Sequence, residues 1–353
     1  TQCSNYRGIS LLSIAAKVLM AVIRGRISAH RETRTREQQA GFRSGRGCID
    51  HVFTLRQLVE KRLRYGQPFC AIFVDFAAAF DSVHRLSLWK ALARDGFPEK
   101  IINILLACYE GAASRVRVYG QYGPPFQVNT GVRQGCVMSP SLFNIVIDWV
   151  LHKTMNANLN PVIGCSGFHI LDLEYADDIV GCSEDANGCQ EFLSSLDAAA
   201  SKLGLRISVP KTKVVSFGLN EPNLTLNGSR LDAVSEFTYL GSVFSASVDL
   251  TTEVGRRLGK AAGAFAQLRP FLWSRRAVSL HTKMRVYNAM VIPVLLYSSE
   301  TWTLKSNDIN HLEVFQNRCL REILGVSLCD RVTNEELRQR CCHQPKMSRL
   351  VQK

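Results

Sequence analysis

The chain lacks any apolar stretch long enough to cross a membrane. A membrane-spanning helix needs about 18 or more successive apolar residues, and the longest apolar segment, residues 286–297, is interrupted by Asn288 and Pro293. Internal repeats and low-complexity segments are also absent, which excludes solenoid and low-complexity proteins. No signal peptide begins the chain. We therefore expect an intracellular protein without a membrane partner.

Cysteine pairs with metal-ligand or disulfide spacing are absent as well. The 12 cysteines are scattered, without a Cys-x-x-Cys pair, and are expected to be reduced intracellular thiols. Cys341, Cys342 and His343 are adjacent, but no second Cys/His pair follows them. Because a tetrahedral zinc site needs four ligands, no structural zinc is expected.

Acidic residues are outnumbered by basic residues at both ends of the chain. The net charge is +13, and residues 1–66 alone carry 13 Lys and Arg against 4 Asp and Glu. Residues 67–219 are close to neutral, at −2, and residues 220–353 carry +6. Basic flanks around a mildly acidic middle suit an enzyme that binds a polyanion and keeps carboxylates at its centre. Solvated helix faces are the alternative explanation for part of this charge.

The most informative segment is Tyr175-Ala176-Asp177-Asp178, which lies between apolar segments. Adjacent acids point to opposite faces of a strand, so both reach one site only at the tip of a tight hairpin. Asp-Asp pairs also cap turns, and the tetrapeptide alone favours neither explanation. A third acid, Asp75, follows the apolar run 69–74, which has the length of a buried strand.

Three carboxylates at strand ends suit Mg²⁺ or Mn²⁺, which accept their remaining ligands from phosphates. Two such ions about 3.5 to 4 Å apart stabilise an in-line phosphoryl displacement, so the chemistry implied is nucleotidyl transfer. We expect Asp75 and Asp177 to share an ion position, with Asp178 as the less certain third ligand. Phe80 would lie under the sugar of an incoming nucleotide and select deoxynucleotides, unless it is a core aromatic. Asp81 is expected to cap a helix or anchor a loop.

The residues also resemble a family, the reverse transcriptase domain of non-LTR, LINE-like retrotransposons. The similar blocks occur in order and cover roughly residues 5–242, so coincidence is very improbable. They are a first fingers block (5–12), a second block (39–47), motif A (72–82), motif B (131–143), motif C (175–178), motif D (203–213) and motif E, the primer grip (237–242).

The resemblance implies roles for individual residues. Arg7 matches an arginine that reaches the triphosphate, and a guanidinium can bind phosphate oxygens with paired hydrogen bonds. Lys211 would lie near the leaving pyrophosphate as a general acid, although Lys213 competes for that role. The remaining nucleotide-binding positions implied are Phe76, Phe80, Gln134 and Gly135. Positions implied to contact template or primer are Arg43, Arg46, Tyr239, Leu240, Gly241, Arg256 and Lys260.

The expected fold class is α+β, a right-hand polymerase. Apolar stripes at helical spacing predict helical fingers over residues 1–66, one of them formed by Leu11, Ala15, Val18, Leu19 and Val22. Residues 67–245 are expected to form an antiparallel-sheet palm that carries the Tyr-Ala-Asp-Asp hairpin, with a fingers hairpin near 112–130. A helical thumb and C-terminal extension are expected over residues 246–353.

The implied function is RNA-directed DNA polymerase activity, with two Mg²⁺ ions that Mn²⁺ can replace. The implied partners are an RNA template, a DNA primer or target, and dNTPs, in a cytoplasmic ribonucleoprotein and the nucleus. By comparison with the family, the chain begins in the middle of the domain, so a fragment or a decayed copy is expected. Alternatives are another palm polymerase, such as a group II intron maturase or an RNA-copying polymerase, and an inactive or domesticated remnant that binds RNA.

Overall fold

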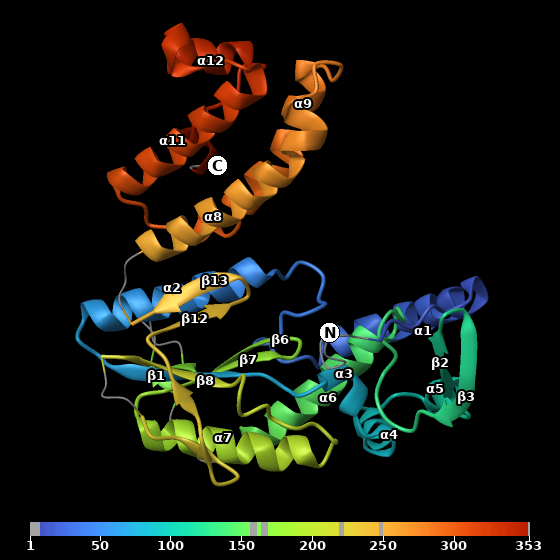
Figure 1. The fold of residues 1–353 in the computed structure, drawn as a ribbon. Coiled ribbons are helices and arrows are strands. Elements are labelled where there is room, and N and C mark those ends of the chain that lie inside the picture. Colours follow the sequence, from blue (N-terminus) through green and yellow to red (C-terminus); the bar gives the residue numbers. More distant parts are fainter. Residues whose placement is uncertain (1–7, 156–160, 164–168, 219–221, 247–249, 352–353) are drawn as a thin grey trace. The chain divides into compact units, whose positions relative to one another are not determined.

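The computed structural model describes residues 8–155, 161–163, 169–218, 222–246 and 250–351. The chain forms two compact units, Thr1–Leu240 and Gly241–Lys353 (Figure 1). The first unit mixes helices with an antiparallel-rich sheet, which confirms the α+β class. Its helices are α1 (Ile14–Glu32), α2 (Cys48–Arg64), α3 (Ala79–Ser82), α4 (Arg85–Arg94), α5 (Glu99–Tyr109), α6 (Ser139–Thr154) and α7 (Ala186–Ser201).

A sheet in the order β11-β8-β1-β7-β6 forms the centre of the first unit. Its strands are β1 (Phe69–Val74), β6 (Asp172–Tyr175), β7 (Asp178–Ser183), β8 (Lys213–Phe217) and β11 (Asp232–Ala233). All neighbours are antiparallel except β11 and β8. Val74 pairs with Ile179, so the residue that follows β1, Asp75, lies beside the beginning of β7.

Helices cover both faces of this sheet. Helix α7 packs on β1 and β7, and α2 contacts β6; Figure 1 shows them on opposite faces. Every residue of β1 is buried, as expected for a central strand made of a continuous apolar run. The smaller strand pairs are β2 (Ala113–Val118) with β3 (Gln121–Gln127), β4 (Val162–Ile163) with β5 (His169–Ile170), β9 (Thr225–Leu226) with β10 (Ser229–Arg230), and β12 (Glu236–Tyr239) with β13 (Ser242–Ser245).

Helix α1 forms as its apolar spacing predicts, but much of the predicted stripe is exposed. Leu11 is 90% exposed, just before the helix, and Val18 is 58% exposed within it. The apolar residues that α1 buries are Met20, Ile23 and Ile27, on another face. Periodicity therefore identified the helix, while the packing partners decided which face is covered.

The second unit is helical after β13 throughout its described residues. Stacked rings form part of its core, with Phe265 and Trp273 centred 4.9 Å apart, and Trp273 Nε1 donates to the Phe265 carbonyl at 2.8 Å. No helix in the described parts of the chain is both long and apolar enough to span a membrane. The elements are α8 (Thr251–Leu268), the π-helix η2 (Arg269–Trp273), α9 (Leu280–Val286), the π-helix η3 (Tyr287–Val291), α10 (Ile292–Leu295), the 3₁₀-helix η4 (Ser299–Thr301), α11 (Ser306–Leu324), the 3₁₀-helix η5 (Leu328–Asp330), α12 (Asn334–Arg340) and α13 (Met347–Val351).

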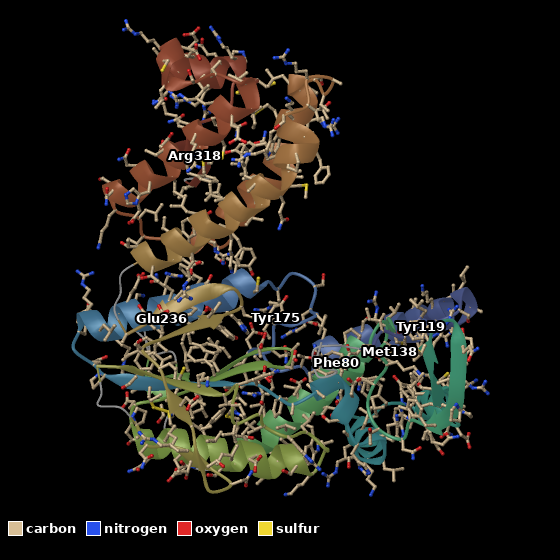
Figure 2. All side chains as sticks on the ribbon, viewed as in Figure 1. Phe80, Tyr119, Met138, Tyr175, Glu236 and Arg318 are labelled. Atoms are coloured by element: carbon tan, nitrogen blue, oxygen red, sulfur yellow. A yellow bond between two sulfur atoms is a disulfide. The ribbon has the colours of Figure 1, made fainter. Side chains whose placement is uncertain are left out.

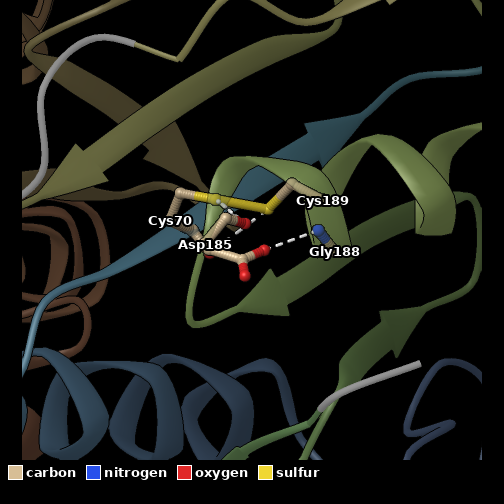
Figure 3. Close-up of a disulfide and its surroundings, with 4 residues drawn as sticks. All are labelled: Cys70, Asp185, Gly188 and Cys189. Carbon is tan, nitrogen blue, oxygen red and sulfur yellow. Dashed lines mark hydrogen bonds between the residues drawn. A yellow bond between two sulfur atoms is a disulfide. The ribbon is translucent and has the colours of Figure 1, made fainter.

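Two cysteines form a disulfide, which corrects the expectation that all are reduced thiols. Cys70 of β1 and Cys189 of α7 are joined in the buried core, with their Cα atoms 7.1 Å apart (Figure 3). Asp185 caps α7 beside this pair, since its carboxylate accepts from the Gly188 amide at 2.6 Å. The pairing spans 119 residues of sequence. Because it depends on α7 packing against β1, cysteine spacing alone could not reveal it.

Candidate active site

The turn between β6 and β7 carries Asp177 at its tip. Tyr175 pairs with Asp178, so Ala176 and Asp177 form a two-residue turn. Ala176 has a φ of 58°, in the left-handed region typical of tight turns between paired strands. Asp177 thus lies in the turn itself, whereas Asp178 is already the first residue of β7.

Gln39, which lies between α1 and α2 in the chain, holds this turn in place through hydrogen bonds. Its buried side-chain oxygen accepts hydrogen bonds from the Ala176 amide at 3.0 Å and the Gly41 amide at 2.8 Å. Its side-chain nitrogen donates to Glu174 Oε2 at 3.3 Å. One amide group therefore connects the second family block to the turn that carries Asp177. The sequence signal was the Gln-Ala-Gly-Phe block, which we expected to belong to the fingers without assigning a role to Gln39.

A buried ion-pair network lies next to this hairpin. Asp172 and Glu174 are two residues apart on β6 and so share one face of the strand. Arg36 donates to Asp172 at 2.9 Å and also to Glu174. Burial raises the pKa of Glu174 well above its usual range, and the Arg36 guanidinium opposes that shift. These acids stabilise the base of the hairpin in a structural role that sequence reasoning did not foresee.

Asp75 follows β1 at the edge of the sheet. Its amide donates to the Thr212 hydroxyl at 3.3 Å. Its carboxylate oxygen Oδ1 is buried and accepts no hydrogen bond, and the Lys211 ammonium lies 3.5 Å from it. A buried carboxylate oxygen without a hydrogen-bond donor is costly unless a cation compensates it. Lys211 supplies this compensation in the structure, and the same carboxylate also lines a large cleft.

A cleft of about 630 Å³ brings together most of the predicted catalytic and nucleotide-binding residues. Asp75 and Asp177 line it from β1 and from the hairpin turn, and Lys211 lines it from the loop before β8. Lys213, the competing lysine, instead forms an ion pair with Asp232. The other predicted nucleotide-binding residues that line the cleft are Phe76, Phe80, Gln134 and Gly135.

Asp178 lines a different, smaller hollow. That hollow, of about 50 Å³, is also bordered by Asp75, Lys211 and Tyr239. Among the described residues, no three His, Cys, Asp or Glu side chains converge as a metal site, so the expected three-carboxylate cluster is not preassembled. The reason is that Asp178 lies in the strand and Asp177 in the turn, and successive strand residues face opposite ways. Asp75 borders both hollows and is the carboxylate common to them.

Phe80 is held rigidly at the wall of the cleft. Ala78 adopts a left-handed φ of 48°, which starts the short helix α3 that carries Phe80. The Phe80 ring stacks on Phe143 of α6 with centroids 4.4 Å apart, and it is labelled in Figure 2. It is only partly buried, so one side packs on the core while the residue also lines the cleft.

Gln134 and Asp81 form a pair across the cleft wall. The Gln134 amide nitrogen donates to Asp81 Oδ2 at 3.0 Å, so Asp81 orients a predicted nucleotide contact. Gly135 has a φ of 98°, and a Cβ there would lie 2.7 Å from the Ser10 carbonyl oxygen. The close backbone approach at Gly135 is therefore to the protein's own chain, beside the cleft.

Several predicted contacts are not among the residues that line this cleft. Arg43 has a nearly buried side chain that binds Glu32 and the carbonyls of Arg36 and Gln39, so it anchors its own loop. Arg46 pairs with Glu37 at 2.5 Å. Leu240 follows β12 with a left-handed φ of 46°. Gly241, Arg256 and Lys260 belong to the second unit, the last two exposed on α8, and Arg7 lies outside the described residues.

Tyr239, the predicted primer-grip aromatic, is buried against the sheet. Its ring lies 5.7 Å from that of Phe73, and its hydroxyl is 3.5 Å from His51 Nδ1. Burial raises the pKa of Tyr239 well above its ordinary value, and the charge of Asp178 adds to that effect. Tyr239 is therefore a neutral wall of the smaller hollow.

Burial of His51 predicts a loss of stability in mild acid. It lowers the pKa of His51 to about 4, against about 6.5 in the unfolded chain. The folded state then binds fewer protons, so this stability is present above pH 6.5 and is lost as the pH falls toward 4. We expect a loss of about 2 kcal/mol between pH 7 and 5 from this group. His51→Gln should show a smaller drop in its urea midpoint over that range; equal drops in both proteins would contradict the assignment.

Known proteins are similar to the part of the chain that contains the cleft. Residues 1–244 match the family described as reverse transcriptase (RNA-dependent DNA polymerase). The probable RNA-directed DNA polymerase from transposon BS of Drosophila melanogaster is 28% identical over 341 residues, 90% of this chain and 36% of that protein. The RNA-directed DNA polymerase from mobile element jockey of Drosophila funebris is 27% identical over 334 residues, 91% of this chain and 36% of that protein.

The chain thus spans 36% of the length of each of these two relatives. A solved structure of telomerase from Candida tropicalis with a TWJ fragment of telomeric RNA aligns with 88% of this chain and 51% of that chain. Its TM-score is 0.48 at 14% identity. The fold class rests instead on the sheet order and the family match.

Proposed function

The chain belongs to the reverse transcriptase (RNA-dependent DNA polymerase) family, and on this premise we propose that it is the polymerase segment of a non-LTR retrotransposon. It would extend a DNA 3′-hydroxyl on an RNA template, using dNTPs. The observation that supports this most directly is the cleft in which Asp75, Asp177, Phe80, Gln134 and Lys211 meet. In the intact element we propose a cytoplasmic ribonucleoprotein that also acts in the nucleus.

The domain partition proposed is that of a right hand. Residues 1–66 correspond to the fingers, residues 67–245 to the palm with a fingers hairpin near 112–130, and residues 246–353 to the thumb and a helical extension. The sheet with its Asp177 turn supports the palm assignment. The helical second unit supports the thumb assignment.

Asp75 and Asp177 are the proposed ligands of divalent ions. The Asp75 carboxylate borders both the cleft and the smaller hollow, which supports this role, and Asp178 is a further ligand only if it shares the ion that Asp75 holds. When bound, two Mg²⁺ or Mn²⁺ ions would stabilise the attacking and leaving oxygens of the in-line displacement. The protein's part is to hold both carboxylates at one end of the cleft, with the turn fixed by Gln39.

Lys211 is the proposed proton donor. Its nitrogen Nζ lies 3.5 Å from Asp75 Oδ1, and its side chain is 64% exposed, so it is able to reach a phosphate in the cleft. A proton from Nζ to the leaving pyrophosphate oxygen would neutralise the charge that develops there. Gln134, oriented by Asp81, would position the template base and the incoming nucleotide.

Phe80 is the proposed selector against ribonucleotides. Because its ring is stacked on Phe143 and cannot retreat into the core, a 2′-hydroxyl beside it would clash. We expect Phe80→Val to raise rNTP incorporation relative to dNTP incorporation by about 10- to 100-fold. Phe80→Tyr, which keeps the ring, should retain the discrimination. Equal rNTP use by the wild type and Phe80→Val would contradict this role.

Primer extension on poly(rA)/oligo(dT) with Mg²⁺ or Mn²⁺ tests the proposed function. Template-dependent incorporation of dTTP by the purified chain is the expected result. An active-site variant, Asp177→Ala, supplies the background signal. Extension equal to that background, with RNA binding intact in both proteins, would instead identify the chain as a non-catalytic RNA-binding remnant.

A further inference from the structure

The hairpin formed by β2 and β3 is almost entirely exposed to solvent. Tyr119 and Gly120 form its turn, with φ values of 48° and 83°. Two successive left-handed residues are the mark of the tight turn that joins twisted strands. Every residue of β2 is exposed, and all but one residue of β3 are exposed as well. An isolated two-stranded hairpin is marginally stable, so something must hold this one.

The base of the hairpin supplies that support. Arg85 of α4 donates to the carbonyls of Val128 at 2.6 Å, Thr130 at 2.9 Å and Gly131 at 2.9 Å. Arg85 and Arg133 each lie 4.9 Å from the centre of the Tyr109 ring. The chain leaving β3 is thereby fixed to α4 and α5 a few residues before Gln134. The hairpin is therefore anchored at its base and lies at one edge of the first unit (Figure 1).

The strand register gives the hairpin two different faces. Arg117 pairs with Tyr122, and its guanidinium lies 5.3 Å from the centre of that ring. The register shifts between Arg115, which pairs with Pro125, and Arg117, with the extra residue on β3. Side chains still alternate along β2, so Arg115 shares the face of Arg117, while Val116 and Val118 occupy the other. Tyr119 is fully exposed at the tip, where Figure 2 labels it. One face is therefore cationic and aromatic, and the opposite face is apolar.

No acid accompanies these arginines. The sequence contains no Asp or Glu between Glu110 and Asp148, and the only charged residues in that stretch are Arg115, Arg117 and Arg133. Neither Arg115 nor Arg117 can therefore be neutralised by a neighbour on the hairpin. An exposed platform of guanidinium groups and rings is complementary to a phosphate backbone whose bases can stack.

We propose that the Arg115, Arg117, Tyr119 and Tyr122 face of this hairpin binds single-stranded RNA. The choice of RNA, as the unpaired template next to the cleft, rests on the proposed function. The arginines contact phosphates and the tyrosines stack on bases, so binding is tolerant of sequence. A protein that docks through the apolar face is the competing occupant, and it would not need the arginines.

RNA binding measured by fluorescence anisotropy tests the proposal without any catalysis. The probe is a labelled single-stranded RNA of mixed sequence, about 20 nucleotides long, enough for several stacked bases. Arg115→Thr/Arg117→Thr should raise its Kd about tenfold and flatten the slope of log K against log salt by about 1.4, since each lost phosphate contact removes about 0.7. Tyr119→Asn/Tyr122→Thr should raise the Kd about tenfold with an unchanged slope. These replacements suit the turn and strand positions, and circular dichroism checks folding.

Two double variants serve as matched controls. Val116→Thr/Val118→Thr changes the opposite face of the same hairpin, and Arg94→Ala/Arg230→Ala removes two exposed charges elsewhere in the first unit. Both should bind the RNA with nearly the wild-type Kd. Wild-type affinity in the arginine and tyrosine variants, or an equal loss in either control, would overturn the proposal. Failure of the wild type to extend a primer would refute the polymerase and leave this binding result standing.

Discussion

Asp177→Asn is expected to lower primer extension on poly(rA)/oligo(dT) by on the order of 10³-fold. The change keeps the shape of the side chain and removes its charge. Ligands of this kind contribute several kcal/mol to the transition state, and about 4 kcal/mol corresponds to that factor. The turn should survive, because its hydrogen bond runs from the Ala176 amide to Gln39 and does not use the Asp177 carboxylate.

Asp75→Asn should produce a loss of the same order, because Asp75 borders both hollows. Asp178→Asn should cost less if Asp178 is the weaker ligand. Asp197→Asn on α7, outside the cleft, is the matched control and should extend primers normally. RNA binding by all four variants should match the wild type. Full activity in Asp177→Asn would eliminate the carboxylate centre proposed for this cleft.

Gly41→Ala is expected to lower primer extension by about 100-fold although Gly41 touches no substrate. A Cβ at this position would overlap the backbone nitrogen of Ala176 and lie 2.9 Å from the Gln39 side-chain oxygen. The collision is with backbone, so the Asp177 turn must shift. A displacement of about 1 Å at a reacting group can cost about 10²-fold in rate, and overpacking of this kind costs about 1 to 3 kcal/mol of stability.

The matched control is Gly25→Ala on α1, where a Cβ would meet nothing within 4 Å. That change should leave activity intact and add about 0.5 to 1 kcal/mol of stability, because alanine favours a helix over glycine. Thermal unfolding and primer extension measured on both variants separate the two effects. A Gly41→Ala protein as active as the wild type would show that the turn is not held by this contact.

Local patterns in the sequence were enough to predict several elements of the structure. The continuous apolar run before Asp75 predicted a buried central strand, and the structure confirms it as β1. The pair Asp177-Asp178 predicted a hairpin, and its turn lies at Ala176 and Asp177. The helical spacing after residue 245 predicted an all-helical end, which the described residues confirm. Each of these depends on neighbours in sequence, through alternation, run length or turn preference.

Contacts between segments that lie far apart in the sequence could not be predicted from local patterns. Gln39 bonds the Ala176 amide across 137 residues, and Cys70 meets Cys189 only because α7 packs on β1. The predicted apolar stripe of α1 is largely exposed, because the neighbours of a helix select its buried face. Arg43, which remains a predicted template or primer contact, donates to the carbonyls of Arg36 and Gln39, and no local sequence pattern indicated this anchoring role.

The sequence by itself determined the family and the α+β class and predicted which carboxylates bind metal, because apolar runs, turns and ordered motifs are local features of the chain. Only the tertiary structure decided which of those carboxylates line the large cleft and which line the small hollow. It placed Asp177 in the large cleft, Asp178 in the small hollow and Asp75 at both. That division follows from strand register and from side chains packed over long sequence distances, and no local pattern specifies either.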